Sequence, residues 1–242
     1  MTTSAETALG NERVRAGADD GQQHTERKNM YVGRIVAVGM SRDGKTVAMY
    51  RVSSRSFPNR EARLDGKTAA IMPKKGFEDD LSKNPYIAYN CLRLAGSFAI
   101  ATNGSHTDPV TEKIAMGIPP RDALASCLLA MDYEKDSLDT PRIAAVADSA
   151  APKGWLGIVR KNAISVLEID LEPGKAYYVA TYEHDAPSKR HYRDDAFDAE
   201  TPEAACSHII RGGVFAELER PVTAAAALAS ENGFELAVET VE

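Results

Sequence analysis

Short apolar, β-branched runs separated by turn signals recur along most of the chain and predict a strand-rich protein. The first two runs, Tyr31–Met40 and Thr46–Ser53, are joined by residues 41–45, which contain Asp43-Gly44. An Asp-Gly pair between two such runs favours a β-hairpin. Further strands are expected at 68–72, 87–94, 98–101, 143–147, 155–159, 164–169, 176–182 and 234–241. The three runs between 143 and 169 fit a meander. The polar, arginine-rich stretch 54–67 and the charged stretch 183–200 are expected to be loops.

Two segments carry helical signals instead. Pro120 suits the first position of a helix. One apolar face then follows at helical spacing, formed by Ala123, Leu124, Cys127, Leu128 and Met131. This predicts a helix over 120–131 that delivers the acidic stretch 132–136 at its C-terminal end, where the helix dipole favours cations. Such a mismatch hints at function. A second helix is expected over 202–211, and another helix start at Asp108-Pro109.

Residues 1–29 differ from the rest of the chain. They contain no aromatic residue, and their few aliphatic residues show no period, which predicts a disordered tail. The strand pattern begins at Met30, so Met30 is an alternative initiator. From Met30 to Glu242 there is neither a repeat nor a second linker, and we expect one α+β domain there.

Composition narrows the class of protein. The 242 residues are 43% hydrophobic and 26% charged, as in soluble globular proteins. Three distant cysteines without a CxxC pair indicate no disulfide framework, which favours a cytoplasmic protein. A net charge of −6 argues against nucleic acid as a partner, and an anionic substrate would need a local basic cluster. No apolar run approaches the roughly 20 residues of a membrane helix, so no membrane partner is expected.

The motifs GxGxxG, HExxH and GxSxG are absent, and the five histidines are scattered, so no metal site is expected. Four polar clusters remain, at 53–60, 84–91, 102–108 and 132–136. Their arginines, hydroxyls, amides and carboxylates could grip a phosphate, hold a planar polar group or move a proton. Taken singly, each cluster also fits a solvated loop, a packed core, a hairpin turn or an exposed charged turn.

Together, the clusters resemble the signature segments of the archaeal-type IMP cyclohydrolase family. The matching segments are Met30–Arg34, Tyr50–Arg60, Asn84–Cys91, Asn103–Asp108, Leu128–Asp136, Thr140–Ala145 and Pro221–Ala225. They occur in order from Met30 almost to the end, and departures fall in the tail, in 63–83 and in 183–200. The resemblance implies a four-layer αββα sandwich of two stacked sheets, like that of the N-terminal nucleophile hydrolases but without a free N-terminal nucleophile.

The activity that the resemblance implies is IMP cyclohydrolase, a hydrolase acting on cyclic amidines. It converts 5-formamido-1-(5-phosphoribosyl)imidazole-4-carboxamide to IMP with loss of water, the last step of de novo purine biosynthesis. The substrate is a small purine nucleotide, and no cofactor is needed. The sequence leaves the oligomeric state open, a homo-oligomer included.

The implied reaction joins a poorly nucleophilic carboxamide nitrogen to a formyl carbon. The resemblance supports Glu134 as the residue that transfers the protons and Arg60 as the cation near the formyl oxygen. Substrate contacts are expected from Arg55, Ser56, Asn59, Tyr89, Asn90, Asn103, Ser105, His106 and Tyr133. Among these, Asn103, Ser105 and His106 are candidates for the phosphate or ribose.

Two other functions fit the residues. One is an amide hydrolase of the same fold, for which Cys91 is the plausible nucleophile. The other is a nucleotide-binding module without turnover, for which Glu134 would be dispensable.

Overall fold

Two antiparallel sheets lie at the centre of the computed structural model, which describes residues 30–242. The tail predicted for residues 1–29 lies outside the described residues. The first sheet has six strands in the order β11-β10-β1-β2-β12-β13. In chain order they are β1 (Arg34–Met40), β2 (Thr46–Ser53), β10 (Lys175–Ala180), β11 (Arg193–Asp194), β12 (Pro221–Ser230) and β13 (Gly233–Thr240).

The second sheet has seven strands that follow one another in chain order from β3 to β9. They are β3 (Arg60–Asp65), β4 (Thr68–Pro73), β5 (Tyr89–Ala95), β6 (Phe98–Thr102), β7 (Arg142–Asp148), β8 (Lys153–Arg160) and β9 (Ala163–Asp170). Each strand pairs antiparallel with the next, so the meander predicted from 143 to 169 is confirmed and extends over the whole sheet.

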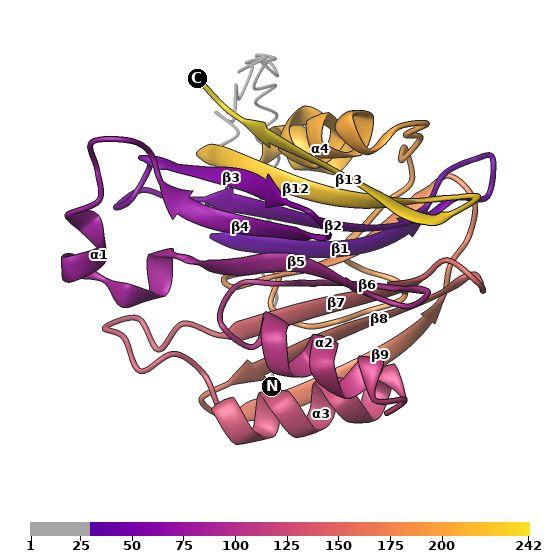
Figure 1. Ribbon diagram of the computed structural model, residues 1–242, viewed down its shortest axis with the longest axis horizontal. Coiled ribbons are helices and arrows are strands. Elements are labelled where there is room, and N and C mark those ends of the chain that lie inside the picture. The colour runs from indigo at the N-terminus through magenta and orange to yellow at the C-terminus, as the bar shows by residue number, and fades with distance from the viewer. Residues whose placement is uncertain (1–29) are drawn as a thin grey trace, which may run out of the picture.

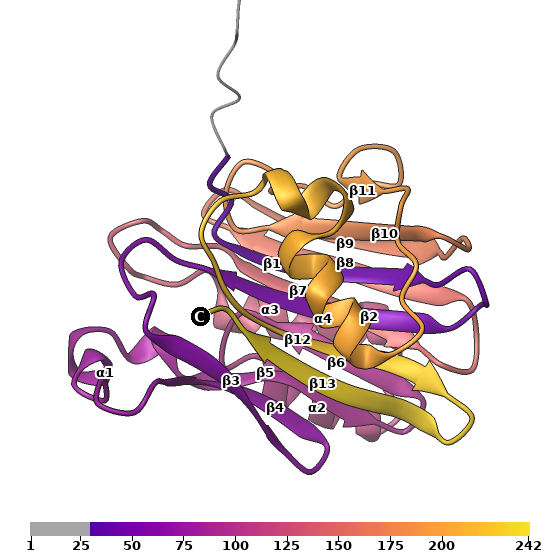
Figure 2. The ribbon, with the colours of Figure 1, turned by 90° about the horizontal axis from the view of Figure 1, so that it is seen from above.

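Helices cover the outer face of each sheet, as Figure 1 shows. Helix α4 (Pro202–Arg211) crosses the six-stranded sheet, which is clearest from above in Figure 2. Helices α2 (Thr107–Ala115) and α3 (Pro120–Met131) pack on the seven-stranded sheet. Short turns of helix also occur at α1 (Asp80–Lys83), η1 (Pro85–Ile87) and η2 (Gly213–Glu217). The layers therefore run helix, sheet, sheet, helix, as expected. Across residues 30–242, the helices are all too short or too polar to span a bilayer.

Three hydrophobic clusters fill the spaces between these layers. The largest lies between the sheets, a second lies under α4, and a third joins α2 and α3 to the seven-stranded sheet. Strand β2 is buried along its whole length because the other sheet covers one face and α4 the other. Its near-continuous apolar sequence is the pattern expected for a strand buried on both faces.

Several local predictions are confirmed. The hairpin between β1 and β2 turns at residues 41–45, with Gly44 at φ +89°, a conformation that glycine adopts without strain. Helix α3 has the predicted bounds and begins with Pro120. Helix α4 also has its predicted bounds, because the Thr201 side chain accepts a hydrogen bond from the N–H of Ala204 and Pro202 follows.

Other predictions are wrong. The stretch 54–67 is not all loop, since β3 occupies Arg60–Asp65 and forms the edge of a sheet, where charged side chains face solvent. Helix α2 begins at Thr107 rather than Pro109, because the Asp108 side chain binds Asn90 and Arg93 instead of capping the helix. The strand expected from Ile87 begins two residues later, after η1.

Candidate active site

One small cavity opens where the predicted polar clusters meet. It has a volume of about 150 Å³ and is walled by segments before β1, after β2, around η1 and after α3. The polar and aromatic residues that line it include Tyr31, Arg34, Ser56, Arg60, Tyr86 and Tyr182. Segments far apart in the sequence thus contribute to a single site, at which two guanidinium groups are present.

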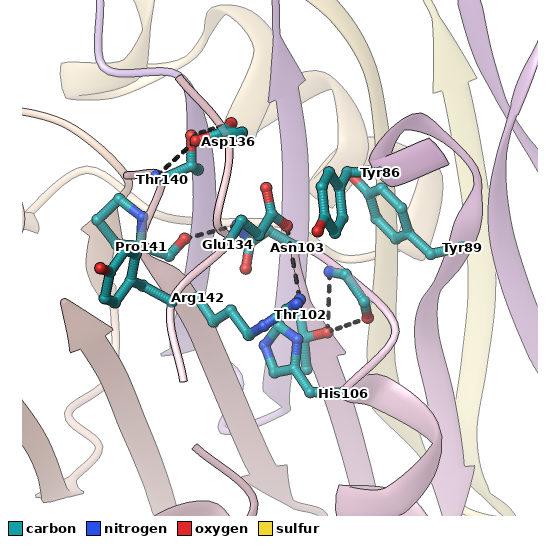
Figure 3. A network of polar contacts seen from close by, with 12 residues as sticks. Tyr86, Tyr89, Thr102, Asn103, His106, Glu134, Asp136, Thr140, Pro141 and Arg142 are labelled. Carbon is teal, nitrogen blue, oxygen red and sulfur yellow. Dashed lines mark hydrogen bonds and ion pairs between the residues drawn. The ribbon is translucent and has the colours of Figure 1, made fainter. Parts of the chain in front are cut away.

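The loop after α3 places Glu134 beside this cavity. Asp132 caps the C-terminal end of α3 and adopts φ +56°. The Asp136 carboxylate then accepts hydrogen bonds from the N–H of Thr140 over 2.9 Å and from its hydroxyl over 2.7 Å. The N–H of Glu134 donates to the carbonyl of Thr140 over 2.8 Å. The acidic cluster is therefore divided, with Asp136 shaping the loop and Glu134 turned inward (Figure 3).

Two arginines contact the buried carboxylate of Glu134. Arg34 Nη2 donates to Oε2 over 3.1 Å, and Arg142 Nη1 forms an ion pair with Oε1 over 3.5 Å. The Glu134 side chain is 0% exposed. Burial raises the pKa of Glu134 above its ordinary value, although Arg34 and Arg142 oppose the shift. A carboxyl group with a raised pKa is suited to taking up and returning a proton near neutral pH.

Arg60 lies in the wall of the same cavity and is only 3% exposed. Its Nε donates to the carbonyl of Phe57 over 3.0 Å, which fixes the plane of the guanidinium group. Burial and the neighbouring Arg34 lower the pKa of Arg60. Arg34 and Arg60 together form a local basic cluster in a chain whose net charge is −6, as an anionic substrate requires.

Tyr89 connects the two sheets below these arginines. Its hydroxyl and that of Tyr50 share a buried hydrogen bond of 2.6 Å. Tyr50 belongs to β2 and Tyr89 to β5, so the bond crosses from one sheet to the other. Burial raises the pKa of Tyr89, although Arg60 and Arg34 oppose the shift. Both hydroxyls are therefore neutral donors and acceptors at physiological pH.

The remaining predicted substrate residues fall in several places. Ser56 lines the cavity. Arg55 lies at its rim, with its guanidinium 4.3 Å from the centre of the Tyr31 ring, and it pairs with Glu219. Asn59 accepts a backbone hydrogen bond from Lys74 through its carbonyl group.

A second, more open cavity of about 360 Å³ collects three of the predicted residues. Tyr89, Asn90 and Ser105 line it together with Asp108. Asn90 Nδ2 donates to Asp108 Oδ1 over 2.9 Å. The predicted substrate residues are thus distributed over two cavities. Tyr89 lines the second cavity and also lies near Arg34 and Arg60.

Asn103 and His106 are fully buried and bind the backbone of β7. Asn103 Nδ2 donates to the carbonyl of Pro141 over 2.9 Å, and its Oδ1 accepts from the N–H of Ile143 over 2.8 Å. His106 Nε2 contacts the carbonyl of Ile143 over 2.9 Å. Both polar ends of Asn103 are thus engaged in joining β6 to β7. Tyr133 packs under the ammonium group of Lys135, 3.4 Å from the centre of its ring.

Arg34 and Arg142, which hold Glu134, are not among the residues predicted from the sequence. Each lies in one of the segments that carry the family resemblance, Met30–Arg34 and Thr140–Ala145. Tyr31 and Tyr182 were also missed, although their rings stack at the cavity with centroids 6.1 Å apart. The signal available in the sequence was an arginine directly before an apolar, strand-like run, at Arg34 and at Arg142.

Cys91 lacks the properties of a nucleophile. It is fully buried, and its thiol donates to the carbonyl of Ala69 over 3.3 Å. Burial raises the pKa of Cys91 well above its ordinary value, so its thiolate is not populated. All three cysteines are free within the described residues.

Residues 39–46 read Gly-Met-Ser-Arg-Asp-Gly-Lys-Thr, the spacing of a phosphate-binding loop. In the structure they form the turn between the antiparallel strands β1 and β2. Lys45 pairs with Asp43 there, over 2.8 Å. A phosphate-binding loop of this type leads from a strand into a helix, so the spacing at 39–46 is coincidental.

Comparison with known proteins agrees with this site. The family model described as "IMP cyclohydrolase-like protein" matches residues 31–233. The chain is 49% identical over 210 residues to the IMP cyclohydrolase of Methanocella arvoryzae, covering 86% of this chain and 98% of the relative. It is 45% identical over 198 residues to that of Methanosphaera stadtmanae, covering 82% and 94%. The cavity residues between Tyr31 and Tyr182 all lie inside the matched range, and the chain belongs to the IMP cyclohydrolase-like family.

Proposed function

We propose that the protein closes the purine ring of 5-formamido-1-(5-phosphoribosyl)imidazole-4-carboxamide to give IMP and water. The relatives that match most of the chain carry the name IMP cyclohydrolase. The observation that carries the proposal is the convergence of separate family segments on one cavity, beside which a buried carboxylate is held between two arginines, one of them in the cavity wall.

Glu134 moves the protons in this proposal. The carboxamide nitrogen attacks the formyl carbon, and the formyl oxygen must gain two protons before it leaves as water. One proton comes from the carboxamide nitrogen and the other from the formamido nitrogen, so a group that takes up and returns protons serves both steps. The raised pKa of Glu134 supports this role. Such transfer contributes typically 10²–10⁴-fold.

Arg60 stabilises the negative charge that develops on the formyl oxygen. Its guanidinium is buried in the cavity wall and held through Phe57, so it is positioned before the substrate binds. A preorganised donor of this kind is worth roughly 3–4 kcal/mol in the transition state. Arg34 contacts both the cavity and Glu134 and therefore keeps the carboxylate oriented toward the substrate.

Substrate entry requires movement at the rim. The cavity of about 150 Å³ is smaller than the roughly 300–1,000 Å³ of typical ligand sites. Leu138 lies at the mouth and is 67% exposed, in the short loop that Asp136 shapes. An outward displacement of this loop enlarges the site without disturbing either sheet.

The proposal includes three finer points. The helix–sheet–sheet–helix order supports a fold like that of the N-terminal nucleophile hydrolases. The three free cysteines support a cytoplasmic enzyme. Light scattering of the purified protein decides whether the enzyme is a homo-oligomer.

The test is direct incubation of the purified protein with the formylated ribonucleotide, followed by the appearance of hypoxanthine absorbance. We expect turnover without added metal or redox cofactor. The Glu134→Gln protein, which keeps the shape of the side chain, is the matched control. Binding of IMP without turnover in the unaltered protein would instead favour the nucleotide-binding module. Loss of activity with a thiol reagent traced to Cys91, prevented by substrate, would favour the amide hydrolase.

A further inference from the structure

Four buried polar atoms belong to three neighbouring side chains, those of Glu134, His106 and Arg142. They are Glu134 Oε1, His106 Nδ1, Arg142 Nε and Arg142 Nη1, and within the described residues 30–242 each lacks a hydrogen-bond partner. Buried polar atoms in folded proteins are nearly always satisfied by protein or by ordered water. Three of these atoms, one from each side chain, converge on one point and therefore indicate a ligand.

Gly104 forms the floor of the space that these atoms surround. A β-carbon on Gly104 would lie 2.8 Å from Arg142 Nη1, 3.3 Å from Glu134 Oε1 and 3.4 Å from His106 Nδ1. Three side chains from three different segments thus converge next to Gly104, and Figure 3 shows Glu134, His106 and Arg142 close together. We call this space the Gly104 chamber. Any larger residue would fill it.

The hydrogen-bonding character of each atom follows from its other contacts. His106 Nε2 faces the carbonyl of Ile143, an acceptor, so Nε2 carries the proton. Burial, together with the nearby Arg142, lowers the pKa of His106 to about 3, so the ring is neutral and Nδ1 is an acceptor. The Glu134 carboxylate oxygen is a second acceptor, and the Arg142 nitrogens are donors.

We propose that the Gly104 chamber binds one water molecule, which accepts a hydrogen bond from Arg142 Nη1 and donates to Glu134 Oε1 and His106 Nδ1. Buried water molecules typically make about three hydrogen bonds, here one from Arg142 Nη1 and one to each of the two acceptors. The direct contact between Arg142 Nη1 and Glu134 Oε1, 3.5 Å long, is an ion pair that leaves both atoms without a hydrogen bond. One water molecule supplies a hydrogen-bond partner to Arg142 Nη1, Glu134 Oε1 and His106 Nδ1.

The bound water positions the proton carrier. It holds Oε1 from behind while Arg34 holds Oε2 from the cavity side. A hydrogen bond to the charged form of a carboxylate stabilises that form, so the water opposes the effect of burial and keeps Glu134 able to accept a proton. The other charged or titratable groups that face Glu134 come from several segments and are Arg34, Arg60, His106, Asp136 and Arg142. This role, unlike the water site itself, rests on the proposed function.

The water site is tested by crystallography at a resolution that shows ordered water. We expect a density peak within hydrogen-bonding distance of Arg142, Glu134 and His106 in the unaltered protein. In Gly104→Ala, a methyl group replaces the water, and the peak is lost. Gly104 has a backbone conformation that alanine tolerates, since it is not among the positive-φ residues. Direct contact between Arg142 and His106, without intervening density, would overturn the proposal.

A matched control exists in the same sheet. A β-carbon on Gly157 would lie 2.9 Å from Leu128 Cδ1, a similar crowding against a flexible side-chain end, but in apolar surroundings. Gly157→Ala should therefore keep the water peak and the kinetics of the unaltered protein. If Gly104→Ala does not fold, His106→Gln is the second variant, because a glutamine amide can still donate to Ile143 while the acceptor at Nδ1 is removed.

The positioning role is tested by the pH dependence of kcat/KM. Without the water, the charged form of Glu134 loses a hydrogen bond, so the acid limb of the profile should move to higher pH in Gly104→Ala and in His106→Gln. A shift of about one pH unit is a tenfold loss on the acid side. An unshifted limb in both variants would overturn the positioning role. If the unaltered protein shows no turnover, the proposed function fails while the density peak still decides the water site.

Discussion

Arg34 in the first strand of one sheet donates from Nη2 to Oε2 of Glu134, which precedes β7 of the other sheet, over 3.1 Å. The proposed proton carrier is thus held from across the sandwich as well as by its own loop. Both side chains are largely buried, with 14% of Arg34 and none of Glu134 exposed. Removing one partner of such a pair leaves an unpaired buried charge, which is far more costly than losing a surface salt bridge.

Glu134→Gln should reduce turnover at least about 10²-fold. The amide keeps the size of the side chain and still accepts a hydrogen bond from Arg34, but it cannot accept a proton. Binding of IMP, measured by calorimetry, should change little. Asp132→Asn is the control, because Asp132 lies two residues away, pairs with exposed Lys135 and has a positive φ that asparagine tolerates. Normal turnover by Glu134→Gln would show that another group carries the proton.

Arg60→Lys should reduce turnover less than Glu134→Gln does. An ammonium group still offsets the charge on the formyl oxygen, but the planar set of donors and the bond from Nε to Phe57 are lost. Steady-state kinetics should show a smaller fall in kcat than for Glu134→Gln. Arg63→Lys, an exposed change in the same strand, serves as the control. A larger loss for Arg60→Lys than for Glu134→Gln contradicts the assigned roles.

His106 should make the free energy of unfolding depend on pH. Its pKa falls from 6.5 to about 3 on folding, chiefly through burial and then through Arg142. The unfolded chain therefore binds the proton more tightly, so stability is fully present above pH 6.5 and is lost as the pH falls from 6.5 toward 3. Urea unfolding of the unaltered protein and of His106→Asn across this range measures the difference. If both lose stability in parallel, His106 is not the source.

The hydrogen bond between Tyr50 and Tyr89 is suited to a double-mutant cycle. Tyr50→Phe leaves the buried hydroxyl of Tyr89 without its partner at 2.6 Å and should cost about 1–3 kcal/mol of unfolding free energy. The double variant with Tyr89→Phe removes both hydroxyls and should cost less than the sum of the single changes. Additive losses would mean that the two hydroxyls do not depend on each other.

Short-range sequence signals were enough to predict the bounds of the elements that begin or end at helix caps or tight turns. The bounds of α3 and α4 followed from Pro120, Thr201 and Pro202, and the first hairpin from Asp43-Gly44. Strand β12 was missed because its run of alanines from Ala224 to Ala227 resembles a helix more than a strand. Its partners β2 and β13 override that propensity by supplying a hydrogen-bonding edge on each side.

The location of the candidate site could be predicted from the sequence, but the hydrogen bonds of its residues could not. The family segments indicated Glu134 and Arg60, both of which lie at or beside one cavity. Asn103 and His106 were predicted to contact the substrate, and in the structure their side chains bind the backbone of Pro141 and Ile143 at the start of β7. Sequence reports which polar residues are near each other along the chain, but not which hydrogen bonds the backbone already occupies.

The position of β12 has a consequence for synthesis of the protein. In the six-stranded sheet, β2 pairs on one side with β1 and on the other with β12, so that Met49 lies beside Ala226. While the ribosome is still making the C-terminal part of the chain, the first hairpin has an open hydrogen-bonding edge and an uncovered apolar face. Such edges pair readily with other chains. The six-stranded sheet is therefore complete only once β12 has been made and has paired with β2, and a chain that stops before residue 221 should expose this edge and aggregate.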